Sequence, residues 1–249
     1  MKTLSGKIIV VTGASRGIGR AIAESCAHDG AIVGVNYLNS HDAAESLRTQ
    51  FPSTVELLKF DVGDYQGTQV AISEFIKRHG RLDVLVNNAG IFRPHLLISQ
   101  RNLDKAHEEF RINTFGAMGC TQVALPYMVK NKGGIIVNIS SCAVTQPQAG
   151  QATYAASKAA IEAYSRAVAV EYAKKGVRCI CLRLGPVDTD MLRGAVGDIG
   201  MKITMPEHVL LKRLLTPAEI AESLRSVLTT SVAMATGSTL DFTAGYTLG

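Results

Sequence analysis

Short apolar runs alternate with longer helical segments along almost the whole chain, and this alternation constrains the fold more than any other feature. The run "IIVV" is apolar on both faces, as is typical of strands in a sheet that helices cover on both sides. Right-handed crossovers between such strands give a doubly wound parallel sheet of the Rossmann type. The composition shows no linker or repeat, so we predict a single α/β domain over residues 1–249. Strands are expected at 7–11, 31–37, 55–60, 82–87, 134–140, 177–184 and 238–242, and helices at about 17–29, 42–50, 65–79, 101–130, 152–174 and 217–229.

The segment 190–211 interrupts this alternation. It contains Gly194, Gly197, Gly200 and Pro206, together with three methionines. Irregular segments of this length are uncommon in compact domains and often act as lids. We therefore predict a substrate flap at about 190–211, with an ordinary long loop as the alternative.

Composition excludes several other classes of protein. The 26 basic and 21 acidic side chains give a net charge of +5, which is a mild excess and not the clustered charge of a nucleic-acid binder. Five cysteines, an odd number without a CxxC motif, indicate buried thiols in a reducing compartment, so we expect a cytoplasmic protein. The six histidines form no close ligand pair, and no metal site is predicted. The apolar run near the start is too short for a signal peptide or membrane anchor.

A glycine-rich turn, "TGASRGIG", follows the first predicted strand and opens the first predicted helix. Gly13, Gly17 and Gly19 permit a tight turn and let the backbone approach a pyrophosphate. The unpaired N–H groups of the helix N-terminus favour the same anion. The turn predicts a dinucleotide site, to which Ser15, Arg16 and Ile18 also contribute, although its spacing departs from GxGxxG.

The stretch "ATYAASKAA" places Tyr154 and Lys158 on one face of an alanine-rich helix. A lysine ammonium one turn away would stabilise a phenolate and lower the tyrosine pKa, which suits a group that donates and accepts protons. The alternative is an ordinary amphipathic helix with a half-buried tyrosine and a solvated lysine.

Five elements together give a resemblance to a known family. They are "TGASRGIG", "NNAG" (87–90), Asn113, Ser141 and the pair Tyr154-x-x-x-Lys158, in order from residue 7 to about residue 245. The chain resembles the short-chain dehydrogenase/reductase family, and its layout is most similar to the β-ketoacyl-acyl-carrier-protein reductase group. The resemblance implies one doubly wound domain that moves a hydride between NAD(P)(H) and a carbonyl or alcohol. Many members form dimers or tetramers, so a homo-oligomer is expected.

The resemblance also implies roles for the four candidate catalytic residues. Tyr154 would be the acid/base, and Lys158 would lower its pKa and bind the nicotinamide ribose. Ser141 would hold the substrate oxygen, with Ser140 as the competitor that strand alternation sends to the opposite face. Asn113 would anchor a water relay to the lysine.

Further cofactor contacts follow from the same resemblance. Asp61 and Val62 would flank the adenine, whereas Asn88, Ala89 and Gly90 would line the ribose and nicotinamide side. Val187 and Thr189 would hold the carboxamide. The chain departs from the family here, because "LGPVDTDM" has Leu184 where the family has proline and places Pro186 after Gly185.

Cofactor choice depends on the end of the second predicted strand. NAD enzymes carry an acidic residue there for the ribose 2′-hydroxyl. This chain has "VNYLNS", with Asn36 and no acid before Asp42, while Arg16 can pair with a 2′-phosphate. We therefore expect NADP(H) to be preferred, with NAD(H) possible.

The substrate is left open between a carrier-bound 3-oxoacyl group and a small carbonyl, sugar or polyol. Acyl carrier proteins are acidic, so a reductase that docks one needs basic residues beside the pocket mouth. Lys132 and Lys175 align with the basic docking positions of the carrier-protein reductases, and Lys130 and Lys174 lie beside them. Lysines at helix C-termini are also favoured by the helix dipole alone. A catalytically silent dinucleotide-binding regulator is the remote alternative. No nucleic-acid or membrane partner is expected.

Overall fold

All seven strands join one parallel sheet in the computed structural model, which describes residues 3–97, 103–199, 209–229 and 235–246. The strand order is β3-β2-β1-β4-β5-β6-β7, and every neighbouring pair is parallel. The strands are β1 (Ile8–Val11), β2 (Ile32–Tyr37), β3 (Val55–Lys59), β4 (Val84–Asn87), β5 (Gly134–Ser141), β6 (Val177–Leu184) and β7 (Thr239–Phe242). The predicted doubly wound Rossmann-like fold is confirmed.

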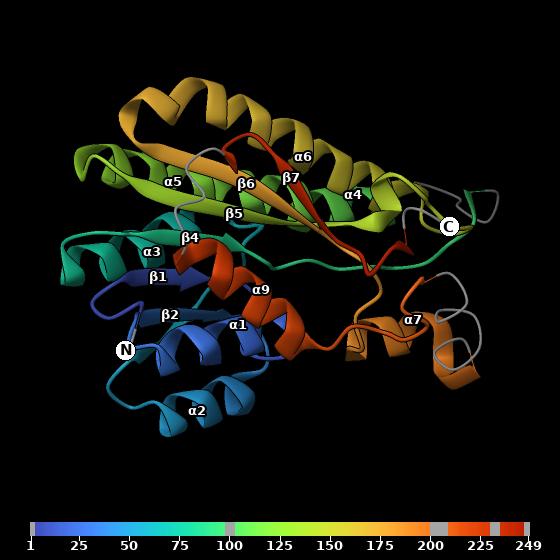
Figure 1. Cartoon of the computed structure of the whole chain (residues 1–249), viewed down its shortest axis with the longest axis horizontal. Helices are drawn as coiled ribbons and strands as arrows, with labels where there is room; N and C mark the ends of the chain where they lie inside the picture. Colours follow the sequence, from blue (N-terminus) through green and yellow to red (C-terminus); the bar gives the residue numbers. More distant parts are fainter. Residues whose placement is uncertain (1–2, 98–102, 200–208, 230–234, 247–249) are drawn as a thin grey trace.

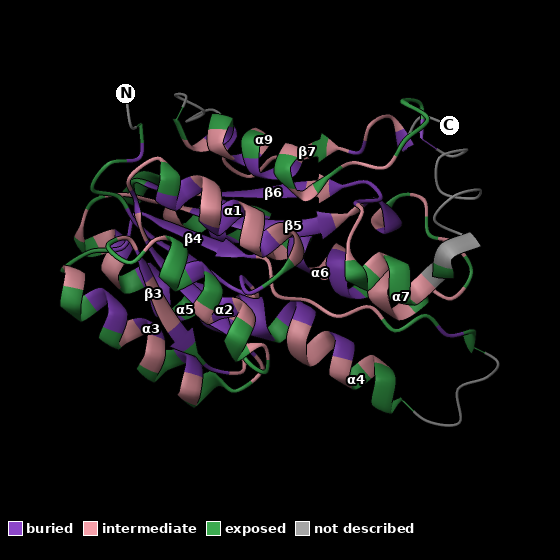
Figure 2. Ribbon diagram, turned by 90° about the horizontal axis from the view of Figure 1, so that it is seen from below, coloured by how far each residue is buried: buried purple, intermediate pink, exposed green. Residues whose placement is uncertain are grey.

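Helices cover both faces of the sheet (Figure 1). The helices are α1 (Gly17–His28), α2 (His41–Gln50), α3 (Tyr65–His79), α4 (Asp104–Phe110), α5 (Ala117–Lys130), α6 (Ala152–Tyr172), α7 (Asp190–Ile199) and α9 (Pro217–Thr229). One core cluster joins the sheet to α1, α2 and α9, and a second joins it to α3, α5 and α6. Buried strands therefore lie between two layers of half-exposed helices, as Figure 2 shows. None of the described helices is long and apolar enough to cross a membrane.

Local signals explain where several helices begin and end. Asp64 caps α3 by accepting a hydrogen bond from the N–H of Gln66 at 3.1 Å. Gly80 ends the same helix in the left-handed region at φ 76°. Thr216 and Glu219 form a reciprocal capping box at the start of α9, whose first residue is Pro217.

Two segments differ from the sequence-based expectation. The long helical region at 101–130 contains a π-helical turn, Arg111–Gly116, between α4 and α5. The expectation of irregular structure was wrong for the first half of the predicted flap, because Asp190–Ile199 is helical, with Asp190 in a favourable first turn. Gly197 still breaks the helical conformation at φ 68°. Gly200 and Pro206 lie outside the described residues.

The cysteines behave as small buried residues. All five are free and buried, and burial raises the pKa of Cys26, Cys120 and Cys179 to about 12. These thiols are therefore protonated and unreactive near neutral pH.

Candidate active site

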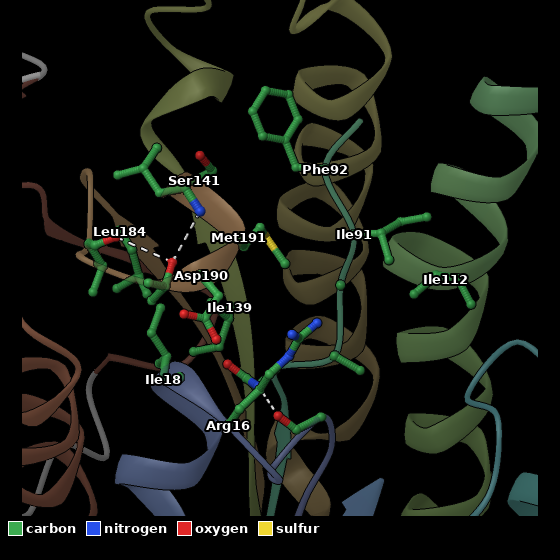
Figure 3. A pocket seen from close by; sticks show the side chains of 18 of the residues that line it. Arg16, Ile18, Ile91, Phe92, Ile112, Ile139, Ser141, Leu184, Asp190 and Met191 are labelled. Atoms are coloured by element: carbon green, nitrogen blue, oxygen red, sulfur yellow. Dashed lines mark hydrogen bonds between the residues drawn. The ribbon is translucent and has the colours of Figure 1, made fainter. Parts of the chain in front are cut away.

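A cavity of about 400 Å³ opens at the carboxyl ends of the strands. This is where doubly wound sheets bind ligands. The cavity reaches from the glycine turn before α1 to the start of α6 and the first turn of α7. In Figure 3, Arg16 and Ile18 lie toward one end, and Ser141 and Phe92 lie toward the other.

Tyr154 and Ser141 meet at one end of this cavity. Tyr154 lies in the first turn of α6, Ser141 ends β5, and the two side chains are hydrogen-bonded. The Ser141 Oγ also accepts a hydrogen bond from the N–H of Ala143 at 3.2 Å. The neighbouring Ser140 instead donates to the buried carboxylate of Glu162 at 2.7 Å, so the two serines have different partners. Ser141 is thus the serine that contacts the tyrosine.

Lys158 lies one helical turn beyond Tyr154 and is buried with 5 % of its surface exposed. Its Nζ donates a hydrogen bond to the Ile139 carbonyl oxygen at 2.9 Å and lies 5.9 Å from the centre of the Tyr154 ring. Burial lowers the pKa of Lys158 to about 8. The alternative of a solvated surface lysine is therefore wrong.

The expected depression of the tyrosine pKa is not found. Burial raises the pKa of Tyr154 to about 12, and the hydrogen bond with Ser141 opposes this rise only in part. Lys158 Nζ is directed to the Ile139 carbonyl oxygen and lies 5.9 Å from the centre of the tyrosine ring. The protein alone therefore holds Tyr154 as a protonated donor.

Asn113 lies in the π-helical turn and is tied to the loop after β4. Its Oδ1 accepts from the N–H of Ile91 at 2.7 Å, and its Nδ2 donates to the Ile91 carbonyl at 2.9 Å. A Cβ atom at Gly90 would lie 3.2 Å from Asn113 Oδ1 and 3.4 Å from Lys158 Nζ. Glycine therefore keeps open the space between the asparagine and the lysine, where a water relay remains a prediction.

The glycine turn has the close contacts expected of a backbone cradle. A Cβ atom at Gly13 would lie 2.9 Å from the Ala89 Cα, and one at Gly19 would lie 2.3 Å from the Gly13 carbonyl oxygen. Asn88 braces the turn, because its Nδ2 donates to the carbonyl oxygens of Thr12 and Gly13. A side chain at Gly13 or Gly19 would therefore require the backbone of this turn to move.

Two predicted cofactor residues are largely engaged in holding the protein together. Asn36 is buried, accepts from the N–H of Gly13 at 3.0 Å and donates to the carbonyl oxygens of Leu58 and Phe60. Asp61 accepts from the N–H of Gly63 and forms an ion pair with Arg111 at 2.8 Å. Asn36 and Asp61 both line the cavity, as does Val62. The partners of their side chains belong to the segments around the cavity, so these side chains hold those segments in place.

The unusual Gly185-Pro186 order keeps the glycine where the fold requires one. A Cβ atom at Gly185 would lie 2.6 Å from the Thr243 carbonyl oxygen. Val187 forms a bridge with Leu215, and the Thr189 Oγ1 donates to the Val187 carbonyl oxygen at 3.4 Å. Val187 and Thr189 line the cavity despite the shifted proline, as the motif predicts.

These features fit a dinucleotide. The N-terminus of α1 has no side-chain cap, so its first N–H groups are available to a phosphate. Ser15, Arg16, Gly17 and Ile18 line the cavity at this point, while Ala89 and Gly90 line it beside the lysine. A dinucleotide here would run from the end of β2 past the glycine turn toward Tyr154.

Comparison with known proteins identifies the family. The sequence model described as short chain dehydrogenase matches residues 7–198, which is well over half of the chain. The chain belongs to the short chain dehydrogenase family. Members of this family are oxidoreductases that use NAD(P)(H). Membership of this family therefore confirms the prediction of a dinucleotide cofactor.

Relatives within the family carry several different names. The chain is 34% identical over 257 residues to a 7alpha-hydroxysteroid dehydrogenase of Paraclostridium sordellii, covering 100% of this chain and 95% of the relative. It is 34% identical over 242 residues to the 3-oxoacyl-acyl-carrier-protein reductase FabG of Vibrio harveyi, covering 97% and 98%. A gluconate 5-dehydrogenase of Burkholderia cenocepacia J2315, crystallised with NADP and tartrate, superposes with a TM-score of 0.91 at 28% identity, covering 98% and 96%. The family is shown, and the relatives leave the substrate open.

The lysines predicted to dock a carrier do not lie beside the cavity of this short chain dehydrogenase. Lys132 precedes the amino end of β5, and Lys175 precedes the amino end of β6. Helix α6 has 21 residues and is about 30 Å long, so it carries the chain from Tyr154 to the opposite edge of the sheet (Figure 1). The prediction that these lysines border the pocket mouth was therefore wrong, because in a single chain they lie at the amino ends of the strands and the cavity lies at the carboxyl ends.

Sequence reasoning missed one cavity residue near the end of the chain, Tyr246. Leu38, Asn39 and Ser40 line the cavity within the "VNYLNS" segment that sequence linked to cofactor choice, and Asp190 and Leu192 line it within the predicted flap segment. Tyr246 carried no periodic or motif signal, and the fold brings it to the cavity from near the end of the chain.

Proposed function

We propose that this protein is an NADP(H)-dependent oxidoreductase that interconverts a ketone and a secondary alcohol. The observation that carries the proposal is the grouping of Tyr154, Ser141 and Lys158 in the same cavity as the glycine turn. A silent dinucleotide-binding regulator would need none of these three side chains.

The chain's own residues account for the proton chemistry. Tyr154, held protonated by its buried site, donates its proton to the carbonyl oxygen during reduction, and Ser141 holds that oxygen with a hydrogen bond. Lys158, whose Nζ is held by the Ile139 carbonyl oxygen at 2.9 Å, would bind the nicotinamide ribose of the bound cofactor. NADPH, when bound, supplies the hydride that the carbonyl carbon accepts.

The proposed preference for NADP(H) rests on two features, the lack of a carboxylate at the end of β2 and the exposed side chain of Arg16. Leu38, Asn39 and Ser40 line the cavity there and carry no carboxylate. Arg16 is exposed at the start of α1, extends into the cavity in Figure 3 and forms no ion pair within the described part of the chain. A free guanidinium suits a 2′-phosphate, which a carboxylate would repel.

The lining favours an uncharged substrate. Ile91, Phe92 and Met191 supply apolar surface, with the Phe92 ring against Tyr154, and Gln148 and Gln151 supply amide groups. Among the described lining residues, the charged side chains are Arg16, Asp61, Lys158 and Asp190, none of which is a spare cation for a substrate carboxylate. A small neutral ketone or alcohol is the first candidate. A carrier-bound 3-oxoacyl group is the second, because several relatives are named as reductases of that substrate.

We also infer a homo-oligomer in the cytoplasm. Phe115 and Val170 are 61% and 83% exposed on the helical layer that contains α5 and α6, which favours burial against a second copy. Five free cysteines suit a reducing compartment. Light scattering after size exclusion distinguishes a monomer from a dimer or tetramer.

The proposed function is tested with a panel of substrates, and the change in NADPH absorbance measures the turnover of each one. The panel contains 2,3-butanedione, ethyl acetoacetate, sorbitol with NADP+, and acetoacetyl groups on a carrier protein or on N-acetylcysteamine. We expect turnover of at least one neutral ketone, with higher kcat/KM for NADPH than for NADH. NADPH binding without turnover of any member would favour the silent regulator. Turnover of the carrier substrate alone would favour the second candidate.

A further inference from the structure

A buried carboxylate lies behind the active site and has no role in the reaction described above. Glu109, in the last turn of α4, is fully buried, with 0% of its surface exposed. Burying a carboxylate is costly unless hydrogen bonds satisfy its oxygens. The partners of this group therefore indicate what the fold gains from it.

The two oxygens of Glu109 bind two different segments. Oε1 accepts a hydrogen bond from the N–H of Arg93 at 2.9 Å, in the loop after β4. Oε2 accepts one from the hydroxyl of Thr153, the residue before Tyr154 at the start of α6. One side chain thus joins a wall of the cavity to the helix that carries the proton donor.

The joined segments also meet inside the cavity. The ring centroids of Phe92 and Tyr154 lie 4.8 Å apart, and both residues line the site. His95 adds a second link, because its Nδ1 donates to the Arg93 carbonyl oxygen at 2.6 Å and its Nε2 lies 3.4 Å from the Thr153 Oγ1. Movement of the loop would therefore move the surface against which the tyrosine packs.

The carboxylate also acts on Tyr154 through charge. Ser141, Cys142 and Glu109 influence the tyrosine hydroxyl, and Lys158 Nζ lies 5.9 Å from the ring. After burial, which dominates, the Cys142 thiol and Glu109 each raise the pKa of Tyr154 further, whereas Ser141 lowers it. Loss of the Glu109 charge would therefore lower this pKa.

We propose that Glu109 is a positioning residue, which fixes Tyr154 against the cavity wall at 91–95 through Thr153 and the Arg93 amide. The inference rests on the proposed reductase function for its kinetic consequence. Its structural consequence, a shared anchor for the two segments, does not depend on turnover.

The chain offers a matched control beside the tested residue. Glu108 is the neighbouring carboxylate, its side chain is 38% exposed, and it forms an ion pair with the Arg93 guanidinium at 2.9 Å. Glu109→Gln keeps an oxygen for the Arg93 amide and removes the charge, while Glu108→Gln removes a charge that does not reach Thr153. Thr153→Val removes the second hydrogen bond, and Thr153→Ser retains the hydroxyl.

The kinetic test uses NADPH with the ketone that the panel finds to be reduced. We expect Glu109→Gln and Thr153→Val to lower kcat about tenfold, because a small misplacement of a catalytic group has effects of this size or larger. The KM for NADPH should not change. The alkaline limb of the kcat profile should move to lower pH in Glu109→Gln, since Tyr154 must be protonated for reduction. Glu108→Gln and Thr153→Ser should behave as the unmodified protein.

Hydrogen exchange provides the second readout, which needs no activity. Glu109→Ala should speed exchange of the Arg93 amide about tenfold, whereas Glu109→Gln and Glu108→Ala should not. If the unmodified protein reduces no ketone, the proposed function is refuted. Hydrogen exchange of the Arg93 amide then still tests whether Glu109 anchors the loop. Unchanged exchange in Glu109→Ala, or an unchanged kcat and pH profile in Glu109→Gln, would overturn the positioning role.

Discussion

Burial controls the ionisation of the two central side chains at the residue scale. Both Tyr154 and Lys158 lose hydration on folding, so each favours its neutral form, with the pKa of the tyrosine raised to about 12 and that of the lysine lowered to about 8. The protein thus holds a neutral proton donor beside a lysine that titrates close to physiological pH. A bound nucleotide would change the surroundings of both.

The lysine pKa predicts a pH-dependent contribution to stability. An unfolded lysine has a pKa near 10.4, so between about pH 8 and pH 10 the unfolded chain binds more protons at this position than the folded one. The stability contributed by Lys158 is therefore fully present above this window, decreases as pH falls across it and is lost below about pH 8. Relative to Lys158→Met, the unmodified protein should gain about 2 kcal/mol of unfolding free energy between pH 7 and pH 10.

Urea unfolding of both proteins at the two pH values measures this difference. Lys59→Met, at an exposed lysine, is the control and should show no such change. A constant difference between Lys158→Met and the unmodified protein across the window would contradict the buried lysine.

Arg16 is the residue on which cofactor choice depends. Arg16→Ala removes the guanidinium at the mouth of the glycine turn and should lower kcat/KM for NADPH by about 10- to 100-fold, which corresponds to the 1.5–3 kcal/mol of a hydrogen bond to a charged group. The value for NADH should change little, because NADH has no 2′-phosphate. Arg48→Ala, whose side chain pairs with Glu45 on α2, is the control. A parallel loss with both cofactors would rule out the phosphate role.

At the scale of elements, the turn after β7 stores local strain. Ala244 has φ 54°, a left-handed conformation that costs a residue with a Cβ about 1–2 kcal/mol. It lies beside Cys142, Val209 and Tyr246, in the cluster that closes one side of the cavity. Gly245 follows with φ 84°, where glycine carries no such cost.

Ala244→Gly should therefore raise the free energy of unfolding by about 0.5–1 kcal/mol, since relief of strain exceeds the added entropy of the unfolded chain. Ala167→Gly, at an exposed position within α6, should lower it by about 1 kcal/mol. Thermal and urea unfolding compare the two. Destabilisation of both variants to the same extent would show that the turn is not strained.

The elements that sequence predicted well are those whose signal is local. The all-apolar run of β1 and the glycine turn that opens α1 are each encoded within a few residues. Helix α7 was missed because Gly194 and Gly197 resemble helix breakers, and Gly197 does leave the helical conformation. Glu109 was missed because "HEEF" looks like an exposed charged helix, and only tertiary packing buries the second glutamate.

At the scale of the whole molecule, the two edges of the sheet have different roles. The carboxyl edge gathers the glycine turn, Ser141, Tyr154 and α7 around one cavity. The amino edge holds Lys132 and Lys175, which motif alignment alone could not place. The order of motifs along the chain was enough to predict the fold and the four candidate catalytic residues. The sequence could not predict which residues are buried, in which direction their pKa values shift, or at which end of the strands a charged residue lies. These properties depend on the folded chain.

The most direct test of the account is a single-turnover measurement of ketone reduction by Tyr154→Phe. The enzyme, in excess over NADPH, is mixed with saturating ketone, and the loss of NADPH absorbance is followed. Because the ring and its packing against Phe92 are kept, NADPH affinity by fluorescence should equal that of the unmodified protein. The hydride-transfer rate should fall by about 10²–10⁴-fold, the usual contribution of a general acid. Tyr127→Phe, away from the cavity on α5, should change neither quantity. A Tyr154→Phe protein that transfers hydride at the unmodified rate would contradict the assignment of Tyr154 as the proton donor.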